Sequence, residues 1–348
     1  MSGSGQRSAV SGQRPAASVV VPAYNTARCL GGLLFDLAHQ TSDEFEVIVS
    51  DDGSTDDTAA VVARYPAVRL VRSVANAGPA AARNRGILAA RATEVMLFVD
   101  ADCRVFPQWV ARHLAAHRAH PHAIIAGPVR GVSQGYFGQA DVFASWYSMT
   151  PGRPSGLETE MHVLTTNLSV KRAAFEQLGL LDESLTMCED AEFVFRAWRA
   201  GLTTYFDGTN PVLHRNRRGF RATMRHHFAF GPWALELRRH APDMPYGWVV
   251  PTNLELAALA MPFLAGLHTA WLLRRWLRYD RRILWYLPGI YLLKLAHAAG
   301  IVSALRSRRP ALPPRIPRLS GQSFSREPQA SACGHLGALA CGSRPKDG

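Results

Sequence analysis

The segments FEVIVSDDGS (45–54) and EVMLFVDAD (94–102) decide the fold. Each is a short apolar run that ends in acidic residues, which is the pattern of a buried strand whose carboxyl end reaches a ligand site. Helix-like stretches separate such runs along the first half of the chain, so we expect parallel strands joined by crossover helices. The predicted fold class is therefore α/β, with a mostly parallel sheet covered by helices on both faces.

The chain around these segments alternates between strand and helix patterns. The Pro- and Gly-containing stretch 147–162 interrupts the alternation, which predicts a surface loop or lid. Strands are expected at 18–22, 45–50, 68–71, 95–99, 123–126 and 163–170, and helices at 27–40, 56–64, 79–91, after Pro107 and at 190–200.

Charge and composition narrow the function classes. The 348 residues carry 39 Lys and Arg against 27 Asp and Glu, a net charge of +12 that favours acidic partners such as nucleotides, nucleic acid or an anionic membrane. No Gly-rich dinucleotide or P-loop motif follows the first strand, which argues against an oxidoreductase and a P-loop enzyme. The acidic residues that end the two strands argue against a nucleic-acid partner, because they would repel its phosphate backbone. Five cysteines without a closely spaced pair indicate neither a disulfide framework nor a zinc site.

The two ends and the final third differ from the rest in composition. Residues 1–17 and 306–348 are rich in Gly, Ser, Arg and Pro, and we predict that both are disordered tails flanking a catalytic domain at 18–235 and a membrane-associated helical region at 236–305. The N-terminus lacks the apolar run of a signal peptide, so we expect a start in the cytosol.

Two apolar runs, 254–273 and 283–305, are long enough to span a membrane. A two-span hairpin would place the five arginines of their connector, RRWLRYDRR (274–282), outside the cell, against the positive-inside tendency. We therefore expect the runs to lie in or dip into the cytosolic leaflet, with the arginines on lipid phosphates. The alternative is a pair of core helices in a soluble domain.

The two acidic clusters follow neighbouring strands of the predicted sheet, so both are expected to face one crevice. Hard carboxylate ligands of this kind suit Mg²⁺ or Mn²⁺ bound together with a diphosphate. The alternative for each acid alone is that it caps the following helix or lies in a solvated loop.

Six motifs, in order and at similar spacing, resemble those of the family 2 glycosyltransferases with a GT-A fold. The resemblance spans about 18–230 and implies an inverting enzyme that uses a nucleotide-diphosphate sugar, of UDP or GDP type, and a sugar or lipid-linked hydroxyl acceptor. A catalytically inactive nucleotide- or lipid-binding protein on the same fold is the alternative. The motifs are VVVPAYN (19–25), VSDDGSTDDT (49–58), NAGPAAARNRG (76–86), VDADC (99–103), TTNLSVKR (165–172) and CEDAEFVFRAWRAG (188–201).

The resemblance also implies roles for individual residues. Asp190 is the expected general base, with Glu189 beside it, although Cys188 and Glu192 depart from the commoner pattern of Gly and Asp. Asp102, its partner Asp100 and His214 are the expected ligands of a divalent metal. The expected nucleotide-sugar contacts are Pro22, Ala23, Tyr24, Asn25, Asp51, Asp52 (favoured over Asp51), Arg83, Asn84, Asp100 and Ala101, and the expected acceptor contacts are Asn167 and Ser169.

The residues themselves leave alternatives open for several of these roles. Arg83 would otherwise be a solvated arginine of its helix, and His214 a surface or packing histidine. The acids at 189–190 would stabilise a helix start without any catalysis. For Asn167 the equal alternative is a side chain that only forms hydrogen bonds with backbone groups.

Overall fold

The computed structural model describes residues 14–159, 163–244, 250–307 and 311–319. Its main sheet has eight strands in the order β3-β2-β1-β4-β9-β6-β10-β8. The strands are β1 (Ala17–Ala23), β2 (Phe45–Asp51), β3 (Val68–Arg72), β4 (Val95–Val99), β6 (Ile124–Ala126), β8 (Gly156–Glu158), β9 (Asn167–Lys171) and β10 (Thr204–Phe206).

Strand direction confirms a mostly parallel sheet, with two exceptions. β1, β2, β3 and β4 pair in parallel, and so do β6 and β10. β9 runs antiparallel to both of its neighbours, β4 and β6, and β8 runs antiparallel to β10. The predicted loop 147–162 therefore contains a short strand that the sequence did not indicate, and its residues 160–162 lie outside the described part.

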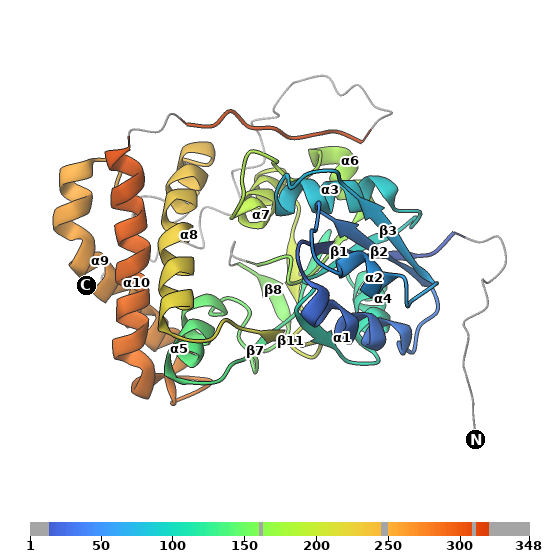
Figure 1. Cartoon of the computed structure of the whole chain (residues 1–348), viewed down its shortest axis with the longest axis horizontal. Coiled ribbons are helices and arrows are strands. Elements are labelled where there is room, and N and C mark those ends of the chain that lie inside the picture. Colours follow the sequence, from blue (N-terminus) through green and yellow to red (C-terminus); the bar gives the residue numbers. More distant parts are fainter. Residues whose placement is uncertain (1–13, 160–162, 245–249, 308–310, 320–348) are drawn as a thin grey trace, which may run out of the picture.

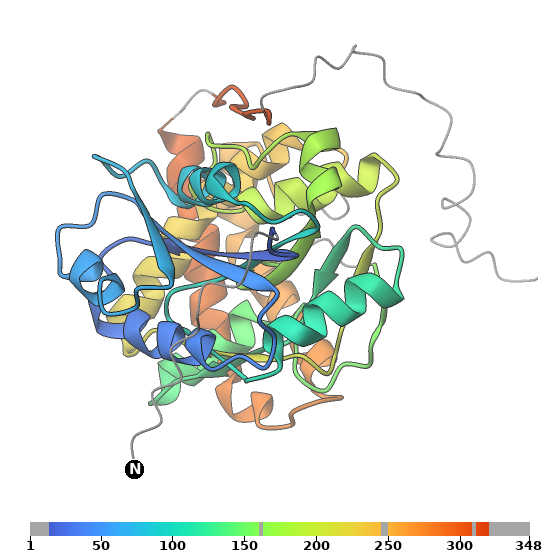
Figure 2. The ribbon, with the colours of Figure 1, turned by 90° about the vertical axis from the view of Figure 1, so that its right-hand side faces the viewer.

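Helices cover both faces of this sheet. Figures 1 and 2 show α3 (Pro79–Ala89), α6 (Arg172–Leu178) and α7 (Glu189–Arg199) on one face. On the other face lie α1 (Ala27–Ala38), α2 (Thr58–Val62) and α4 (Trp109–Ala119). α3 begins with Pro79, which is favourable at the first position of a helix because its missing N–H would be unpaired there.

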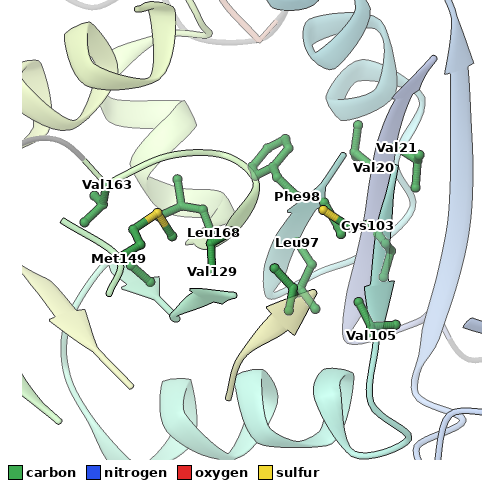
Figure 3. Packing of buried hydrophobic residues seen from close by; sticks show 14 of the residues in the cluster. Val20, Val21, Leu97, Phe98, Cys103, Val105, Val129, Met149, Val163 and Leu168 are labelled. Atoms are coloured by element: carbon green, nitrogen blue, oxygen red, sulfur yellow. The ribbon is translucent and has the colours of Figure 1, made fainter. Parts of the chain in front are cut away.

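The core lies between these layers and is built from the apolar runs of the central strands. Figure 3 shows Cys103 beside Val20, Val21 and Phe98, all of them buried. Burial raises the pKa of the Cys103 and Cys188 thiols well above the usual range, so both behave as small apolar side chains.

A second, smaller sheet was not predicted from the sequence. It has three strands in the order β5-β11-β7, with β5 at Cys103–Val105, β7 at Val129–Val132 and β11 at Val212–Arg215. β11 pairs antiparallel to β5 and places His214 directly opposite Cys103. This pairing brings a histidine from late in the chain next to the acids that follow β4.

The C-terminal third forms a layer of helices beside the sheet and its covering helices (Figure 1). α10 (Ile283–Arg306) packs against α8 (Phe220–His240), α9 (Leu254–Trp276) and the unpredicted α5 (Tyr136–Ser145). α8 and α10 approach each other closely at Gly231 and Gly300. Both positions require glycine, because a Cβ on either residue would collide with the backbone of the other helix. α9 and α10 are both long and apolar enough to cross a membrane.

One stretch of the predicted C-terminal tail is ordered. Residues 311–319 run across the 179–184 loop, where Leu180 N donates to Pro317 O at 2.8 Å and Glu183 N to Arg315 O at 2.9 Å. The prediction of disorder from residue 306 onward is therefore wrong for this segment, because backbone pairing compensates for its few large apolar side chains. Residues 320–348 lie outside the described part.

Candidate active site

Arg83 lies at the centre of the site and joins its two acidic clusters. Its guanidinium donates to Asp100 Oδ1 at 2.9 Å and to Glu189 Oε1 at 2.6 Å. The side chain is buried, and Thr166 Oγ1 donates to the other oxygen of Asp100 at 2.7 Å. Arg83 from α3 thus holds the acid that follows β4 next to the start of α7. Of the two alternatives for Arg83, the structure excludes the solvated helix arginine.

The turn into α7 presents Glu189 and Asp190. Cys188 adopts a left-handed conformation with φ of 69°, a conformation that favours glycine. Asp190 Oδ2 accepts from Thr165 N at 3.3 Å. Burial raises the pKa of Asp190, and Arg83 opposes that rise. Burial and the neighbouring Asp190 raise the pKa of Glu189, and its ion pair with Arg83 opposes that rise.

Asp102, Cys103 and His214 form a cluster that could hold a metal ion, since one ligand atom from each lies within 4.8 Å of the others. His214 Nε2 is 3.3 Å from Asp102 Oδ1. Burial raises the pKa of Asp102, against the effect of His214. The structure thus brings together the predicted ligands Asp102 and His214, while Asp100 turns to Arg83 and Thr166. Two ligands of one ion at about 2.1 Å are separated by roughly 3 Å, so this pair fits a divalent cation.

The acids after β2 are both buried and both engaged with the protein. Asp51 accepts from Ser54 N at 2.9 Å and pairs with Arg72 at 3.0 Å. Asp52 Oδ2 accepts from the backbone N–H groups of Ala77 and Gly78, at 3.0 and 2.8 Å. Its other oxygen pairs with Arg85. In this arrangement Asp52 holds the loop before α3. To bind the base or ribose of a nucleotide, Asp52 would need that loop or Arg85 to move, so the predicted nucleotide contact of Asp52 stays a prediction.

The turn after β1 has two exposed residues, Tyr24 and Asn25. Tyr24 is 48% exposed, whereas Ala23 is buried and Pro22 is half-buried. Asn25 has a positive φ of 53°, and its Oδ1 accepts from Thr55 N at 2.9 Å. Tyr24 is therefore the member of the predicted Pro22 to Asn25 turn that is free to contact a ligand through its side chain. Ala101 is buried and could contribute only its backbone.

Three predicted contacts have buried side chains that bind within the protein, so their roles toward a ligand stay predictions. Asn84 accepts from Leu181 N at 3.0 Å and donates to its carbonyl, so it fixes the loop before α7. Asn167 and Ser169 have no exposed surface, since β9 is a central strand and α4 packs against the face that carries them. Their partners are side chains and carbonyls of the core, with bonds to Trp109, His113, His117, Ile125, Pro128 and Asn210.

Several residues of the site were missed. Thr165 and Thr166 contact Asp190 and Asp100, although they stand directly before Asn167 in a motif that was noted. The side chain of Asn216, two positions after His214, has its Oδ1 3.2 Å from His214 Nδ1. Their closeness in sequence to motif residues was the available signal.

Comparison with known proteins agrees with this arrangement. The family model described as glycosyl transferase family 2 matches residues 18–179. Validoxylamine A glucosyltransferase of Streptomyces hygroscopicus subsp. jinggangensis is 40% identical over 128 residues, which are 35% of this chain and 29% of that protein. An uncharacterized glycosyltransferase of Haemophilus influenzae is 27% identical over 206 residues, 57% of this chain and 67% of that protein. The match thus spans less than a third of the first of these relatives.

Solved structures share the fold at low sequence identity. The mannosyltransferase PcManGT from Pyrobaculum calidifontis, solved with GDP-Man and Mn²⁺, superposes with a TM-score of 0.52 at 20% identity, covering 82% of this chain and 87% of that one. S. aureus TarS 1–349 in complex with UDP-GlcNAc gives a TM-score of 0.50 at 18% identity, covering 84% and 91%. The GT-A type of α/β fold is therefore confirmed.

Proposed function

We propose, from the premise that this chain belongs to glycosyl transferase family 2, that it moves a sugar from a nucleotide-diphosphate sugar to a hydroxyl acceptor with inversion at the anomeric carbon. One observation carries the proposal. Arg83 joins Asp100, two residues before the proposed cation ligand Asp102, to Glu189, the neighbour of the proposed base Asp190, which supports a single site for both roles. A single displacement needs one base and no carboxylate nucleophile.

Asp190 is the proposed general base. It is held at the helix start by Thr165 N and by its own turn, and its raised pKa brings a carboxylate closer to the basicity that proton abstraction requires. Asp190 takes the proton of the acceptor hydroxyl as that oxygen attacks the sugar. Glu189 is bound to Arg83 and contributes by holding the arginine between the clusters.

Asp102 and His214 are the residues that would hold a divalent cation, either Mn²⁺ or Mg²⁺. When bound, such an ion neutralises the charge of the leaving nucleoside diphosphate. The presence of GDP-Man and Mn²⁺ in PcManGT, and of UDP-GlcNAc in TarS, supports a donor of the UDP or GDP type for this chain. Tyr24 is the proposed contact with the base or ribose from the β1 turn.

We further propose that the protein binds the cytosolic face of a membrane through α9. Its large exposed side chains recur three or four residues apart along one face. Lys294 and His297 of α10 are instead turned into the protein, where Lys294 Nζ donates to Ala144 O at 3.0 Å, which argues against α10 as a lipid-immersed span. The exposed residues of α9 are Leu256, Leu259, Phe263, Leu267 and Trp271.

The arginines of 274–282 follow this face of α9 directly and would bind lipid phosphates. Leu259→Glu/Phe263→Glu should abolish sedimentation with vesicles of phosphatidylglycerol and phosphatidylcholine. Both side chains are exposed, so these substitutions leave core residues such as Leu97 unchanged. High salt should weaken sedimentation of the wild type without abolishing it. Equal sedimentation of both proteins would rule out α9 as the contact.

A thermal-shift screen of UDP- and GDP-sugars, with and without Mn²⁺, tests the proposed function. A bound donor raises the melting temperature by mass action, and the rise should require the metal. Absence of any shift would refute nucleotide-sugar use. A shift without transfer to any acceptor would favour the catalytically inactive alternative.

A further inference from the structure

A buried chain of polar side chains runs from His214 into the helical layer. His214 Nδ1 lies 3.2 Å from Asn216 Oδ1, and Asn216 Nδ2 donates to Asp141 Oδ2 at 3.0 Å. Asp141 is on α5, and its other oxygen accepts from His227 of α8 at 2.9 Å. Trp146, just after α5, donates through its indole N–H to the same Asn216 oxygen at 2.9 Å. All five side chains are buried.

The donor and acceptor atoms of Asn216 and its partners in this hydrogen-bond network can be assigned in only one way. An indole N–H can only donate, so the Asn216 atom that faces Trp146 must be the amide oxygen. The amide nitrogen then faces the Asp141 carboxylate, which can only accept. A flipped amide would place N–H against N–H and oxygen against carboxylate. Because His214 Nδ1 faces an oxygen, it must carry the proton.

A neutral imidazole with its proton on Nδ1 has its lone pair on Nε2. That lone pair faces Asp102 Oδ1 at 3.3 Å, so in the neutral imidazole two acceptor atoms lie opposite each other. Two acceptors in this position repel unless a positively charged group binds them both, which a divalent cation would do. Histidine ligands of metals usually donate their other ring N–H to an oxygen of the protein, which fixes the ring.

We propose that Asn216 and Asp141 are positioning residues that hold His214 in the Nδ1–H tautomer, with Nε2 presented to a divalent cation beside Asp102. The inference rests on the metal-dependent function proposed above. Trp146 fixes the amide of Asn216, and its ring packs against the His214 ring at a centroid distance of 4.6 Å. His227 fixes Asp141, so the α8 and α10 layer contributes to the rigidity of the cation site.

The tautomer can be measured without any metal. In the full chain labelled with ¹⁵N-histidine at pH 8, the signals of His214, assigned by their loss in His214→Gln, should show a protonated Nδ1 and an unprotonated Nε2. A proton on Nε2, or on both nitrogens, would overturn the proposal. This outcome is independent of whether the protein binds a metal or transfers sugar.

Metal affinity gives a second readout. Electron paramagnetic resonance of free Mn²⁺, titrated with protein in the presence of UDP, should show affinity about 10- to 100-fold weaker in Asn216→Ala. The double variant Asn216→Asp/Asp141→Asn exchanges amide and carboxylate and keeps every hydrogen bond. The oxygen at position 216 still accepts from His214 and Trp146, so affinity should return to near that of the wild type.

Ser145→Ala is the matched control, because its hydroxyl donates to Asp141 Oδ1 at a longer distance of 3.3 Å and makes no hydrogen bond to Asn216 among the described residues. Its affinity for Mn²⁺ should be unchanged. If Asn216→Ala binds Mn²⁺ as the wild type does, or if the exchange variant folds and remains as weak as Asn216→Ala, the positioning role is refuted. If Asn216→Ala does not fold, Trp146→Phe takes its place and should lower the fraction of His214 protonated at Nδ1. No Mn²⁺ binding by the wild type would refute the proposed metal dependence, while the tautomer still decides the arrangement.

Discussion

Arg83 Nη1 lies 2.6 Å from Glu189 Oε1, so a single buried ion pair fastens α3 to the start of α7. The same guanidinium reaches Asp100. This position makes Arg83 the residue on which the relative placement of the two acidic clusters depends. Its positive charge also opposes the rise in the pKa of both acids that open α7.

Replacing Arg83 should therefore impair both stability and turnover. Arg83→Met leaves Glu189 buried without its partner, a change that costs about 3–5 kcal/mol of unfolding free energy. Chemical denaturation measures this loss. Arg199→Met, at an exposed arginine on the same helix as Glu189, is the control and should lie within about 0.5 kcal/mol of the wild type. Equal stabilities of the two variants would contradict the role of the buried pair.

The two carboxylates of the proposed mechanism can be separated by substitution. Asp190→Asn and Asp102→Asn should each reduce kcat by about 10²-fold or more, because one removes the base and the other a cation ligand. Only Asp102→Asn should strongly weaken Mn²⁺-dependent binding of nucleotide, measured by calorimetry. Near-normal turnover of Asp190→Asn on its acceptor would show that the base is another group.

The pH dependence of turnover should carry the signature of a buried base. Asp190 must be deprotonated to accept a proton, so kcat rises with pH through its pKa. Since burial raises that pKa, the midpoint of the acidic limb should lie above the value of about 3.9 for an ordinary aspartate. Arg83 lowers the pKa of Asp190, so Arg83→Gln, if active, should move the limb to higher pH. A limb that stays in place in this variant would argue against Asp190 as the titrating group.

The sequence predicts the position of residues that follow a strand end. It does not predict which strand residues are buried, because burial depends on the other elements that pack against that strand. Asp102 and His214 were both expected at one site, and β5 and β11 bring them together. The alternation of TTNLSV gave no sign that β9 would be covered on both faces. Asn167 and Ser169 therefore read as site residues, although they pair with histidines of α4 in the core.

Those histidines predict how stability changes with pH. Burial lowers the pKa of His113 to about 4 and of His117 to about 3, so both stay neutral in the folded protein at pH 5.5. The unfolded chain, with histidine pKa values of about 6.5, binds protons there, and stability is lost as pH falls below that value. From pH 7.5 to 5.5 each histidine should cost about 1.4 kcal/mol. Urea unfolding of the wild type and His117→Gln at both pH values measures the difference, and an equal loss in both would exclude His117.

The ordered segment 311–319 should stabilise the loop that precedes α7. Besides its two backbone bonds to that loop, Arg315 N donates to Asp182 Oδ1 at 2.8 Å and Leu312 N to Glu236 Oε1 at 2.6 Å. At about 0.5–1.5 kcal/mol for each hydrogen bond, a chain ending at residue 310 should lose roughly 2–6 kcal/mol of unfolding free energy. A chain ending at residue 319 keeps all of these bonds and is the matched control.

Because Asn84 holds Leu181 in the same loop, the shorter chain should also turn over more slowly, through displacement of Asp190. If the two truncated chains unfold at the same denaturant concentration and retain the same kcat, the segment contributes neither to stability nor to the placement of the base.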